Sequence, residues 1–484
     1  MVMKQTKYDI LAKNTLYFTI GSFGSKLLSF LLLPLYTNIL STDEYGQADL
    51  VLTVAALAVL IVSLNIADAV LRFSMDPKLN SEEVAKNGVL ISLIGSLLFG
   101  VILIIVKCSG VIQIPNNIFL FLFFYVLISS LLNVASSYLN STGRVKKVAI
   151  SGIVNTLSTI ISNIVTLAYI KIGLTGYLFS LCVGQLIAFL YCVLSCRDYK
   201  RIIQKKVLDQ TIRRDMLSYS VPLLVNGIAW WINTSLDKFF ILWLIDTNAN
   251  GIYAISQKIP TVITLLSSFF LQALNISTIK EFESDNSNIF LSKTYNVLNT
   301  GLVLCCSSLM VINIPIARFL YAKDFFQAWK YVPFLLISIV FNAEGSAIGY
   351  IFNAVKNTKV ASLSTAIGAI VNLVFNAILI PQLGIQGAAI ATAVSFFFVW
   401  IFRLFYSKKY IKWDIRIKTH LISYVLLVIQ AICGITVFEN LNVYIIQIII
   451  ILFLVWLYKK DLIELYYSTT NQIKEWTKSR TNGE

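Results

Sequence analysis

Long apolar segments alternate with short polar connections along almost the whole chain. Each apolar segment approaches or exceeds the roughly 20 residues that cross a bilayer as a helix. Segments of this length exclude the shorter strands of a membrane β-barrel. We therefore predict an all-α polytopic membrane protein with about 14 transmembrane helices. The predicted helices cover residues 13–40, 47–72, 87–106, 117–139, 147–170, 175–195, 216–245, 251–275, 294–316, 331–354, 359–380, 386–407, 419–438 and 442–458.

Lysine and arginine gather in every second connection between these predicted helices. With the N-terminus placed inside, 31 of the 39 basic residues fall on inner segments, five on outer segments and three within helices. Because basic residues are retained on the cytoplasmic side, both termini are predicted to be cytoplasmic. The first apolar segment is too long for a signal-peptide core, so we expect it to remain as a transmembrane helix.

Composition supports a membrane protein and excludes several other classes. Hydrophobic residues make up 57% of the chain and charged residues only 13%, with a mean hydropathy of +0.77. A net charge of +15 could suggest a nucleic-acid partner. However, the basic residues lie at the ends of apolar segments, so we expect no nucleic acid. Connections this short leave no room for a catalytic domain, and we predict that the protein is not an enzyme.

Cysteine and histidine give no sign of a metal site. The seven cysteines lie mostly within apolar segments without the spacing of a zinc site, and His420 is the single histidine. Small buried hydrophobic cysteines are the simplest interpretation. We therefore predict neither a metal nor a cofactor.

Two halves of the sequence resemble each other. Tyr138–Ala149 aligns without gaps to Tyr350–Ala361, and Tyr45-Gly46 matches Asn250-Gly251. Six predicted helices fill each repeat, so both copies enter the membrane from the same side, as parallel repeats do. The predicted divisions are an N-lobe at 1–196, a basic cytoplasmic linker at 197–215, a C-lobe at 216–407, two further helices at 408–458 and a cytoplasmic tail at 459–484.

Charged side chains inside the predicted helices are the candidate functional residues. A charge near the bilayer centre is costly and normally faces a partner or a wet cavity. Lys26 lies too far from either end of its helix to reach water, so it either lines a cavity or pairs with Asp68. Asp68 is also spaced to pair with Arg72 on one helix face. Cations outnumber acids among these residues, and a mildly cationic cavity suits an anionic headgroup. The candidates are Lys26, Asp68, Arg72, Asp237, Lys238, Lys258 and Glu344.

The second half of the chain contains intramembrane charges that could pair in more than one way. Asp237 and Lys238 are adjacent, so they project in different directions and cannot satisfy each other well. Asp237 could instead clasp Lys258 on the next helix, or Lys258 could be a free cation in the cavity. Glu344 has no basic neighbour in its own helix, and burial favours its neutral form. A role in proton or ion coupling is therefore one interpretation of Glu344.

Several short stretches resemble the multidrug/oligosaccharidyl-lipid/polysaccharide exporter superfamily. Within it the chain is similar to the Wzx-type flippases of O-antigen and capsule repeat units. The first half carries Ser25-Lys26-Leu27-Leu28-Ser29-Phe30, Tyr45-Gly46 and Ala69-Val70-Leu71-Arg72-Phe73. The second half carries Asn233 followed by Asp237-Lys238, then Gly251-x-Tyr253 and Lys258.

This resemblance implies both an architecture and a cargo. It implies two six-helix lobes in a V around a central cavity, with two C-terminal helices appended. It implies transfer of an undecaprenyl-pyrophosphate-linked oligosaccharide to the outer leaflet of a bacterial cytoplasmic membrane. It also implies H⁺ or Na⁺ as the coupling ion, and a polysaccharide polymerase and chain-length regulator as partners beside membrane lipid. The cavity cations implied are Lys26, Arg72, Lys238 and Lys258, with Asp68, Asp237 and Glu344 as counter-charges or coupling groups.

Three other functions stay open on the sequence. A small-molecule or multidrug antiporter of the same superfamily would need acidic residues to dominate the cavity. A lipid II flippase would differ only in its cargo. A membrane polysaccharide polymerase commonly uses a large outer loop, which the predicted connections do not provide.

Overall fold

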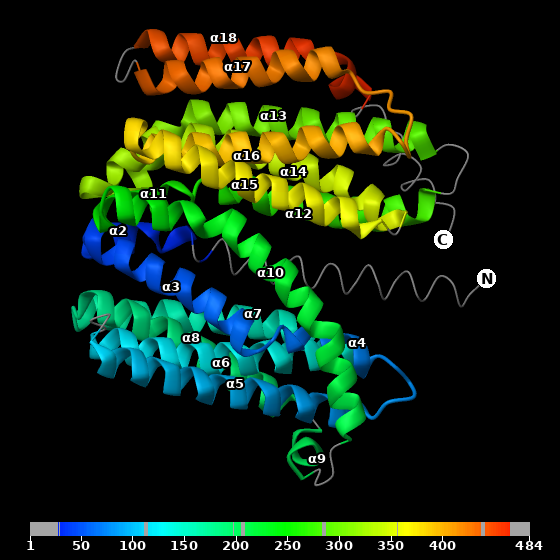
Figure 1. Cartoon of the computed structure of the whole chain (residues 1–484). Helices are drawn as coiled ribbons and strands as arrows, with labels where there is room; N and C mark the ends of the chain where they lie inside the picture. The colour runs from blue at the N-terminus through cyan, green and yellow to red at the C-terminus, as the bar shows by residue number, and fades with distance from the viewer. Residues whose placement is uncertain are drawn as a thin grey trace, which may run out of the picture. The chain divides into compact units, whose positions relative to one another are not determined.

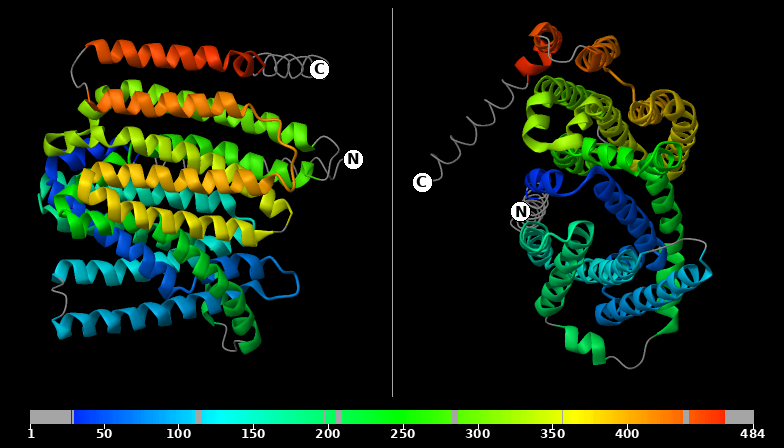
Figure 2. Two further views of the ribbon diagram at one scale, coloured as in Figure 1. Left: turned by 45° about the horizontal axis from the view of Figure 1, so that its top comes forward. Right: turned by 90° about the vertical axis from the view of Figure 1, so that its left-hand side faces the viewer.

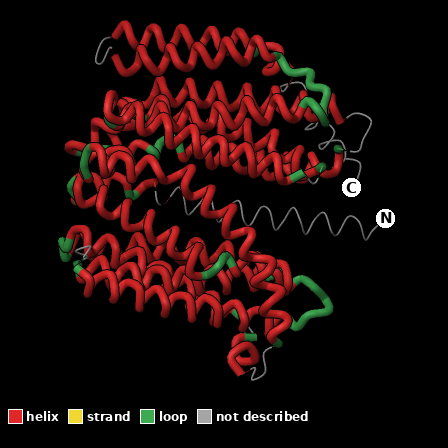
Figure 3. The backbone as a smooth tube through the Cα atoms, viewed as in Figure 1, coloured by secondary structure: helices red, strands yellow, loops and turns green. Residues whose placement is uncertain are grey.

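In the part of the chain that it describes, the computed structural model consists of helices joined by loops and turns, without a strand (Figure 3). It describes residues 28, 30–110, 115–196, 198–204, 209–282, 287–355, 357–436 and 441–464. The helices up to the middle of the chain are α2 Leu33–Ile39, α3 Thr42–Val62, α4 Ile66–Ser74, α5 Ser81–Ser109, α6 Asn116–Ser141, α7 Val145–Asn163, α8 Gly173–Ser195, α9 Tyr199–Gln204 and α10 Gln210–Leu244. The others are α11 Thr247–Ser256, α12 Thr261–Glu281, α13 Ser287–Leu320, α14 Val332–Ala354, α15 Thr358–Leu383, α16 Ile385–Ser407, α17 Ile417–Thr436 and α18 Leu441–Leu457.

Many of these helices are long and apolar enough to cross a membrane. Within the described ranges, 10 helices meet that condition, or 11 if α11 and α12 together form one bent span. The prediction of an all-α polytopic protein is confirmed. The predicted total of about 14 spans stays a prediction.

The chain divides into two compact units (Figure 1). One unit extends through Phe239 and adds Asp246–Gly251 and Leu320–Phe325. The other holds the remaining residues from Phe240 onwards. The predicted lobe boundaries, at 1–196 and 216–407, stay predictions.

In the first unit, the long helices α5, α6, α7 and α8 lie side by side (Figures 1 and 2). Helix α6 packs against both α5 and α8, and α7 packs against α8. The short α4 packs on α5 and α6, where Val70, Val134 and Tyr138 belong to one buried cluster. This packing holds the last part of the predicted second helix against the bundle.

The predicted helix at 47–72 is wrong at both its start and its continuity. Helix α3 begins earlier, because Ser41 and Glu44 form a capping box at its N-terminus. It ends at Val62, since Leu64 and Asn65 adopt left-handed backbone conformations with φ of 50° and 52°. A second helix, α4, then begins at Ile66. Asp68 and Arg72 therefore lie on α4, separate from the helix that carries Asp49.

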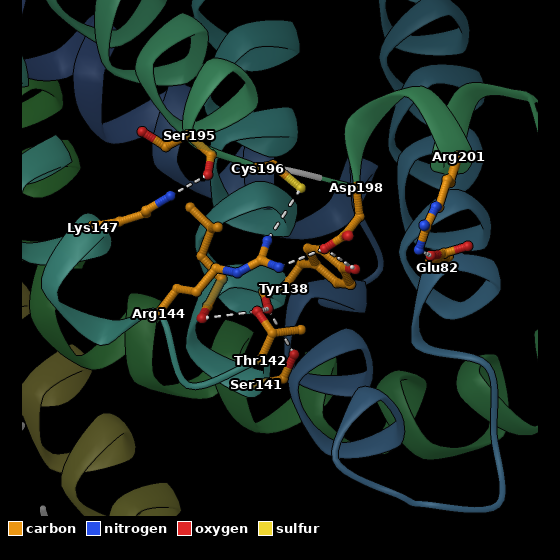
Figure 4. A network of polar contacts seen from close by, with 11 residues as sticks. Glu82, Tyr138, Ser141, Thr142, Arg144, Lys147, Ser195, Cys196, Asp198 and Arg201 are labelled. Atoms are coloured by element: carbon orange, nitrogen blue, oxygen red, sulfur yellow. Dashed lines mark hydrogen bonds and ion pairs between the residues drawn. The ribbon is translucent and has the colours of Figure 1, made fainter.

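Basic residues near 144–147 fix the ends of α6 to α9 in the first unit (Figure 4). Arg144 Nη2 lies 2.6 Å from Asp198 Oδ2, and Lys147 Nζ donates to the Ser195 carbonyl. Arg201 reaches Glu82 at 3.6 Å. The predicted basic linker at 197–215 thus holds α9 and the first turns of α10, rather than an unstructured loop.

In the second unit, α14 is the central helix. It packs against α12, α16 and α17, while α15 packs along α16 and α17 along α18. Sixteen of its residues are buried, so both polar and apolar faces of α14 are covered by neighbouring helices. A charged residue on α14 therefore depends on protein partners rather than on water.

The predicted helix at 251–275 is bent. Helices α11 and α12 meet at an angle of 46° across residues 257–260. Pro260 explains the interruption, because its ring lacks the N–H that a continuing helix needs. The gap predicted at 276–293 is also shorter than expected, since α12 extends to Glu281 and α13 begins at Ser287.

Candidate functional site

Lys238 of α10 is ion-paired in the first unit. Its Nζ lies 2.8 Å from Asp49 Oδ2 and 3.1 Å from Asp49 Oδ1. The hydroxyl of Thr53, one turn further along α3, lies 3.3 Å from the same nitrogen. The side chains of Lys238 and Asp49 are only 12% and 15% exposed. Lys238 is therefore half of a largely buried pair, and its positive charge is locally balanced.

Sequence reasoning missed Asp49. The predicted helix begins at residue 47, which makes Asp49 look like an acidic residue at a wet helix start. The capping box at Ser41 and Glu44 is the signal that could have corrected this, because it places Asp49 in the second turn of α3. From there it faces α10.

Asp237 is buried beside Lys238. Its side chain is 4% exposed, and Oδ1 accepts the backbone N–H of Lys238 at 3.0 Å. Asn233, one turn earlier, is also 4% exposed. Asp237 belongs to the first unit and Lys258 to the second, so the predicted clasp between them stays a prediction.

Lys258 lies in the break between α11 and α12. Its backbone closes a turn, with the N–H bonded to Ile255 O at 3.0 Å and the carbonyl accepting Thr261 Oγ1 at 2.5 Å. The residue is partly buried. Its Nζ makes no ion pair or hydrogen bond with any residue that the structure describes. Lys258 thus presents an ammonium group from an interrupted membrane helix.

Asp68 and Arg72 lie exposed on α4. Asp68 Oδ2 accepts Asn65 Nδ2 at 2.7 Å, and within the described ranges no ion pair joins it to Arg72. The i, i+4 pair is therefore not formed, because Asn65 at the helix start takes the carboxylate instead. Lys26 lies outside the described residues, and so does any contact it makes.

Glu344 of α14 is fully buried and surrounded by hydrogen-bond donors. Its Oε2 accepts Tyr295 Oη at 2.8 Å and Tyr424 Oη at 2.5 Å, and its Oε1 accepts Asn299 Nδ2 at 2.7 Å. The donors come from α13 and α17, which the sequence could not place next to α14. Within the described ranges this carboxyl has no Lys, Arg or His partner.

Arg403 lies within α16, in the predicted helix at 386–407, and its guanidinium reaches inward. Its guanidinium donates to Ser364 Oγ at 2.8 Å and Gly345 O at 2.9 Å. Gly349 leaves room for it, since an added Cβ there would lie 2.9 Å from Arg403 Nη1. This guanidinium therefore holds α14, α15 and α16 together.

The two sequence repeats meet at a pair of glycines. A Cβ on Gly46 would lie 2.0 Å from Thr247 O, and a Cβ on Gly251 would lie 2.0 Å from Thr42 O. The contact is reciprocal, as expected for repeat-related residues. Asn250 Nδ2 adds a hydrogen bond to Gly46 O at 3.1 Å. The Tyr45-Gly46 and Asn250-Gly251 match thus marks a close approach of two helix starts.

A family model for polysaccharide biosynthesis proteins matches residues 11–275. This is more than half of the chain. The protein belongs to the polysaccharide biosynthesis protein family. That family lies in the superfamily suggested by the motifs, so the resemblance to that superfamily is confirmed. The matched segment contains Lys26, Arg72, Lys238 and Lys258, the four candidate cations.

Two relatives are similar in sequence to this polysaccharide biosynthesis protein. An uncharacterized membrane protein of Methanocaldococcus jannaschii is 22% identical over 83% of this chain and 99% of its own length. A probable low-salt glycan biosynthesis flippase of Haloferax volcanii, Agl15, is 24% identical over 38% of this chain and 39% of its own length.

Solved structures share the fold. A lipid II flippase MurJ in an inward closed conformation has a TM-score of 0.69 at 16% identity, covering 93% of this chain and all of that one. An inward-facing multidrug transporter of the MATE family has a TM-score of 0.63 at 14% identity, covering 79% and 94%. A transporter from Pyrococcus furiosus, described by the reverse polarity of its binding pocket, has a TM-score of 0.59 at 12% identity, covering 83% and 95%. These similar structures are of transporters and flippases rather than enzymes.

Proposed function

We propose that this protein moves an undecaprenyl-pyrophosphate-linked oligosaccharide repeat unit from the inner to the outer leaflet of the cytoplasmic membrane. The product would serve polysaccharide assembly such as O-antigen or capsule. The family match supports a role in polysaccharide biosynthesis. The Haloferax relative supports a flippase rather than a synthase.

The observation that carries the proposal is the setting of Lys258. An ammonium group inside an apolar span is expensive unless it meets a counter-charge or water. Lys258 has no acidic partner among the described residues, and it lies where the helix is interrupted. A pyrophosphate is the counter-charge that the proposed cargo would bring, and Lys is a common phosphate ligand.

The other candidate cations divide into different roles under this proposal. Arg72 is exposed and unpaired with Asp68, so it can meet an approaching headgroup. Lys238 is held by Asp49, so it shapes the site before the cargo arrives. Lys26 is proposed as a further cavity cation from its sequence setting.

Transport would proceed by alternating access between the two proposed lobes, 1–196 and 216–407. The oligosaccharide would occupy the cavity while the polyprenyl tail stays in lipid. H⁺ or Na⁺ would couple the cycle to an ion gradient. Both termini would be cytoplasmic. On the opposite side of the membrane, a polysaccharide polymerase and chain-length regulator would take up the exported unit.

Two related cargoes remain as alternatives. The fold likeness to MurJ, with 93% of this chain covered, favours lipid II as the nearest alternative. The likeness to MATE transporters favours a small molecule or drug. A cationic drug would need an available acidic side chain. Asp49 is already paired with Lys238, and Glu344 is enclosed by hydrogen-bond donors, so neither acid favours a drug as the cargo.

The proposal is tested by deleting the gene and analysing lipid-linked glycans. We expect one undecaprenyl-linked repeat unit to accumulate on the inner face, and complementation by the wild-type gene to remove it. Accumulation of lipid II instead would assign the lipid II alternative. Normal glycans together with increased sensitivity to drugs would overturn the proposal in favour of the multidrug antiporter.

A further inference from the structure

Glu344 stands at the centre of a buried hydrogen-bond network in the second unit. Besides its three donors, the network contains Trp400 and Tyr458. Trp400 Nε1 donates to Tyr295 Oη at 2.7 Å, and Tyr458 Oη donates to Asn299 Oδ1 at 2.6 Å. Every one of these side chains is buried. The network joins α13, α14, α16, α17 and the residue that follows α18.

The direction of each hydrogen bond can be worked out from the chemistry of the groups. An indole N–H only donates, so Tyr295 accepts from Trp400, and its single hydrogen goes to Glu344. Asn299 Nδ2 donates to Glu344 at 2.7 Å and to Tyr424 Oη at 2.8 Å. Tyr424 therefore also has its hydrogen free for Glu344. All three neighbours donate to the carboxyl group, which suits the ionised form.

The ionised form, however, has no counter-charge. Within the described ranges no basic nitrogen pairs with Glu344, and a buried charge without a partner is destabilising. A neutral Glu344 would avoid that charge. Its new O–H would have to donate to a tyrosine oxygen, and that tyrosine's own hydrogen would then lose its acceptor. The ionised form thus lacks a counter-charge, and the neutral form leaves one tyrosine hydrogen without an acceptor.

Further titratable and charged groups lie on the helices packed around Glu344. His420 of α17 lies next to two network tyrosines, with tilted rings whose centroids are 5.9 Å from Tyr295 and 6.3 Å from Tyr458. Beyond the end of α18, Asp461 pairs with Arg416 at 2.9 Å, and burial raises the pKa of Asp461 while Arg416 opposes that shift. Other charged or titratable groups on these helices include Glu281 of α12, Lys293 and Arg318 of α13, Tyr350 of α14, Arg403 and Tyr406 of α16, and Lys418 of α17.

The network reaches the edge of the span. Tyr458 lies just beyond α18 and contacts Ser423 Oγ at 2.8 Å. A series of polar groups therefore leads from Glu344 through Asn299 to the end of the helix pair. Ser423, Tyr458 and Asn299 are all fully buried, so these contacts connect Glu344 to the end of α18 within the protein interior.

From this geometry we infer that Glu344 is a proton-binding site whose occupancy controls how firmly α17 is attached to α13 and α14. An incoming proton forms the O–H bond of the neutral acid and displaces a tyrosine hydrogen from the carboxylate. Tyr424 is the group by which α17 holds that carboxylate. Protonation replaces its charge-assisted hydrogen bond with a weaker neutral one, so α17 is held less firmly. The proton site stands by itself, and only its use as the coupling site rests on the proposed flippase function.

Infrared pH-difference spectra of the full-length protein in phospholipid vesicles without glycan test the binding site. The wild type should show a carboxylic-acid carbonyl band whose intensity falls as the pH is raised over the range in which the protein stays folded. Glu344→Gln should lose the band, and the matched control Asp461→Asn should keep it. Absence of a titrating band in the wild type, or its survival in Glu344→Gln, would overturn the assignment.

Two further measurements test the link to α17. Tyr424→Phe removes one donor to the anion, so the midpoint of the band should rise by about one pH unit. This variant carries the test if Glu344→Gln fails to accumulate. Amide protection factors over 417–436, which are corrected for the intrinsic pH dependence of exchange, should be lower on the acidic side of the midpoint in the wild type and equal on both sides in Glu344→Gln. An unmoved midpoint, or equal protection on both sides in the wild type, would contradict the inference.

Because no glycan is present, these results do not depend on transport. A titrating band together with failed flipping would overturn the proposed function and keep the proton site. Flipping without a titrating band would do the reverse.

Discussion

Lys258 and Lys238 differ in whether an acidic side chain neutralises them, although both were predicted from the sequence to be cavity cations. Lys238 meets Asp49 at 2.8 Å, whereas Lys258 has no acid partner among the described residues. An ion pair of this kind balances its own charge and contributes to packing. An unpaired ammonium in a broken helix is available to a ligand. The two lysines should therefore respond differently to substitution.

Substituting Lys258 should impair transport rather than folding. A hydrogen bond to a charged group contributes about 1.5–3 kcal/mol, so Lys258→Ala should lower export about tenfold or more. Lys258→Arg should retain part of it, because the charge remains. The measurement is accumulation of lipid-linked repeat unit in the complemented deletion strain. Lys78→Ala, an exposed residue in a connection, is the control, and export by Lys258→Ala at the control level would remove Lys258 from the mechanism.

Substituting the Asp49–Lys238 pair should affect stability in a non-additive way. Removal of either partner leaves the other charge largely buried, at a cost on the order of 3 kcal/mol. Asp49→Ala and Lys238→Ala should each lower the melting temperature in detergent, and the double variant should lose less than their sum. Additive losses would show that the two charges do not interact.

Sequence reasoning succeeded at residues whose signal is local. Glu344 was recognised as an intramembrane acid with no basic neighbour in its helix, and that observation holds. Its partners Tyr295 and Tyr424 were missed, because they come from helices 49 and 80 positions away. The partners of Arg403 were missed for the same reason, since only the packing of α14 to α16 shows that its guanidinium is enclosed.

At the level of helices, the breaks are the informative features. Hydropathy predicted single helices at 47–72 and 251–275, and both are interrupted. Pro260 was a visible signal for the second break. The first was hidden, because Leu64 and Asn65 turn the chain without a proline or glycine. Asp68 and Arg72 lie on the helix that follows the first break, and Lys258 lies within the second break.

The glycine contact between the starts of α3 and α11 gives a direct structural test. An alanine at Gly46 would place its Cβ 2.0 Å from Thr247 O, so the backbone would have to separate. Gly46→Ala should destabilise the protein by about 1–3 kcal/mol. Gly301→Ala is the matched control, because Gly301 lies within α13 with nothing near its Cβ position. The melting temperature in detergent is the readout.

The control variant should be neutral or slightly stabilising, since alanine favours a helix interior over glycine. Equal melting temperatures for Gly46→Ala and Gly301→Ala would show that the two helix starts do not need their close approach.

For the whole molecule, composition and the alternation of basic connections were sufficient to predict a polytopic helical membrane protein. The internal repeat predicted that Tyr45-Gly46 and Asn250-Gly251 occupy related positions, and the reciprocal contact agrees with this. The cargo is a different matter. The short motifs do not indicate which sugars the cargo contains. The fold does not identify the cargo either, because a lipid II flippase and multidrug transporters share it.

The most direct test of the account is a flipping assay with purified full-length protein. The repeat unit that accumulates in the deletion strain would be isolated and placed in vesicles, with and without the protein. The account predicts that the protein brings the lipid-linked oligosaccharide to the opposite leaflet, where a lectin detects it, and that Lys258→Ala does so about tenfold more slowly or worse. Transfer at the rate of protein-free vesicles would contradict it.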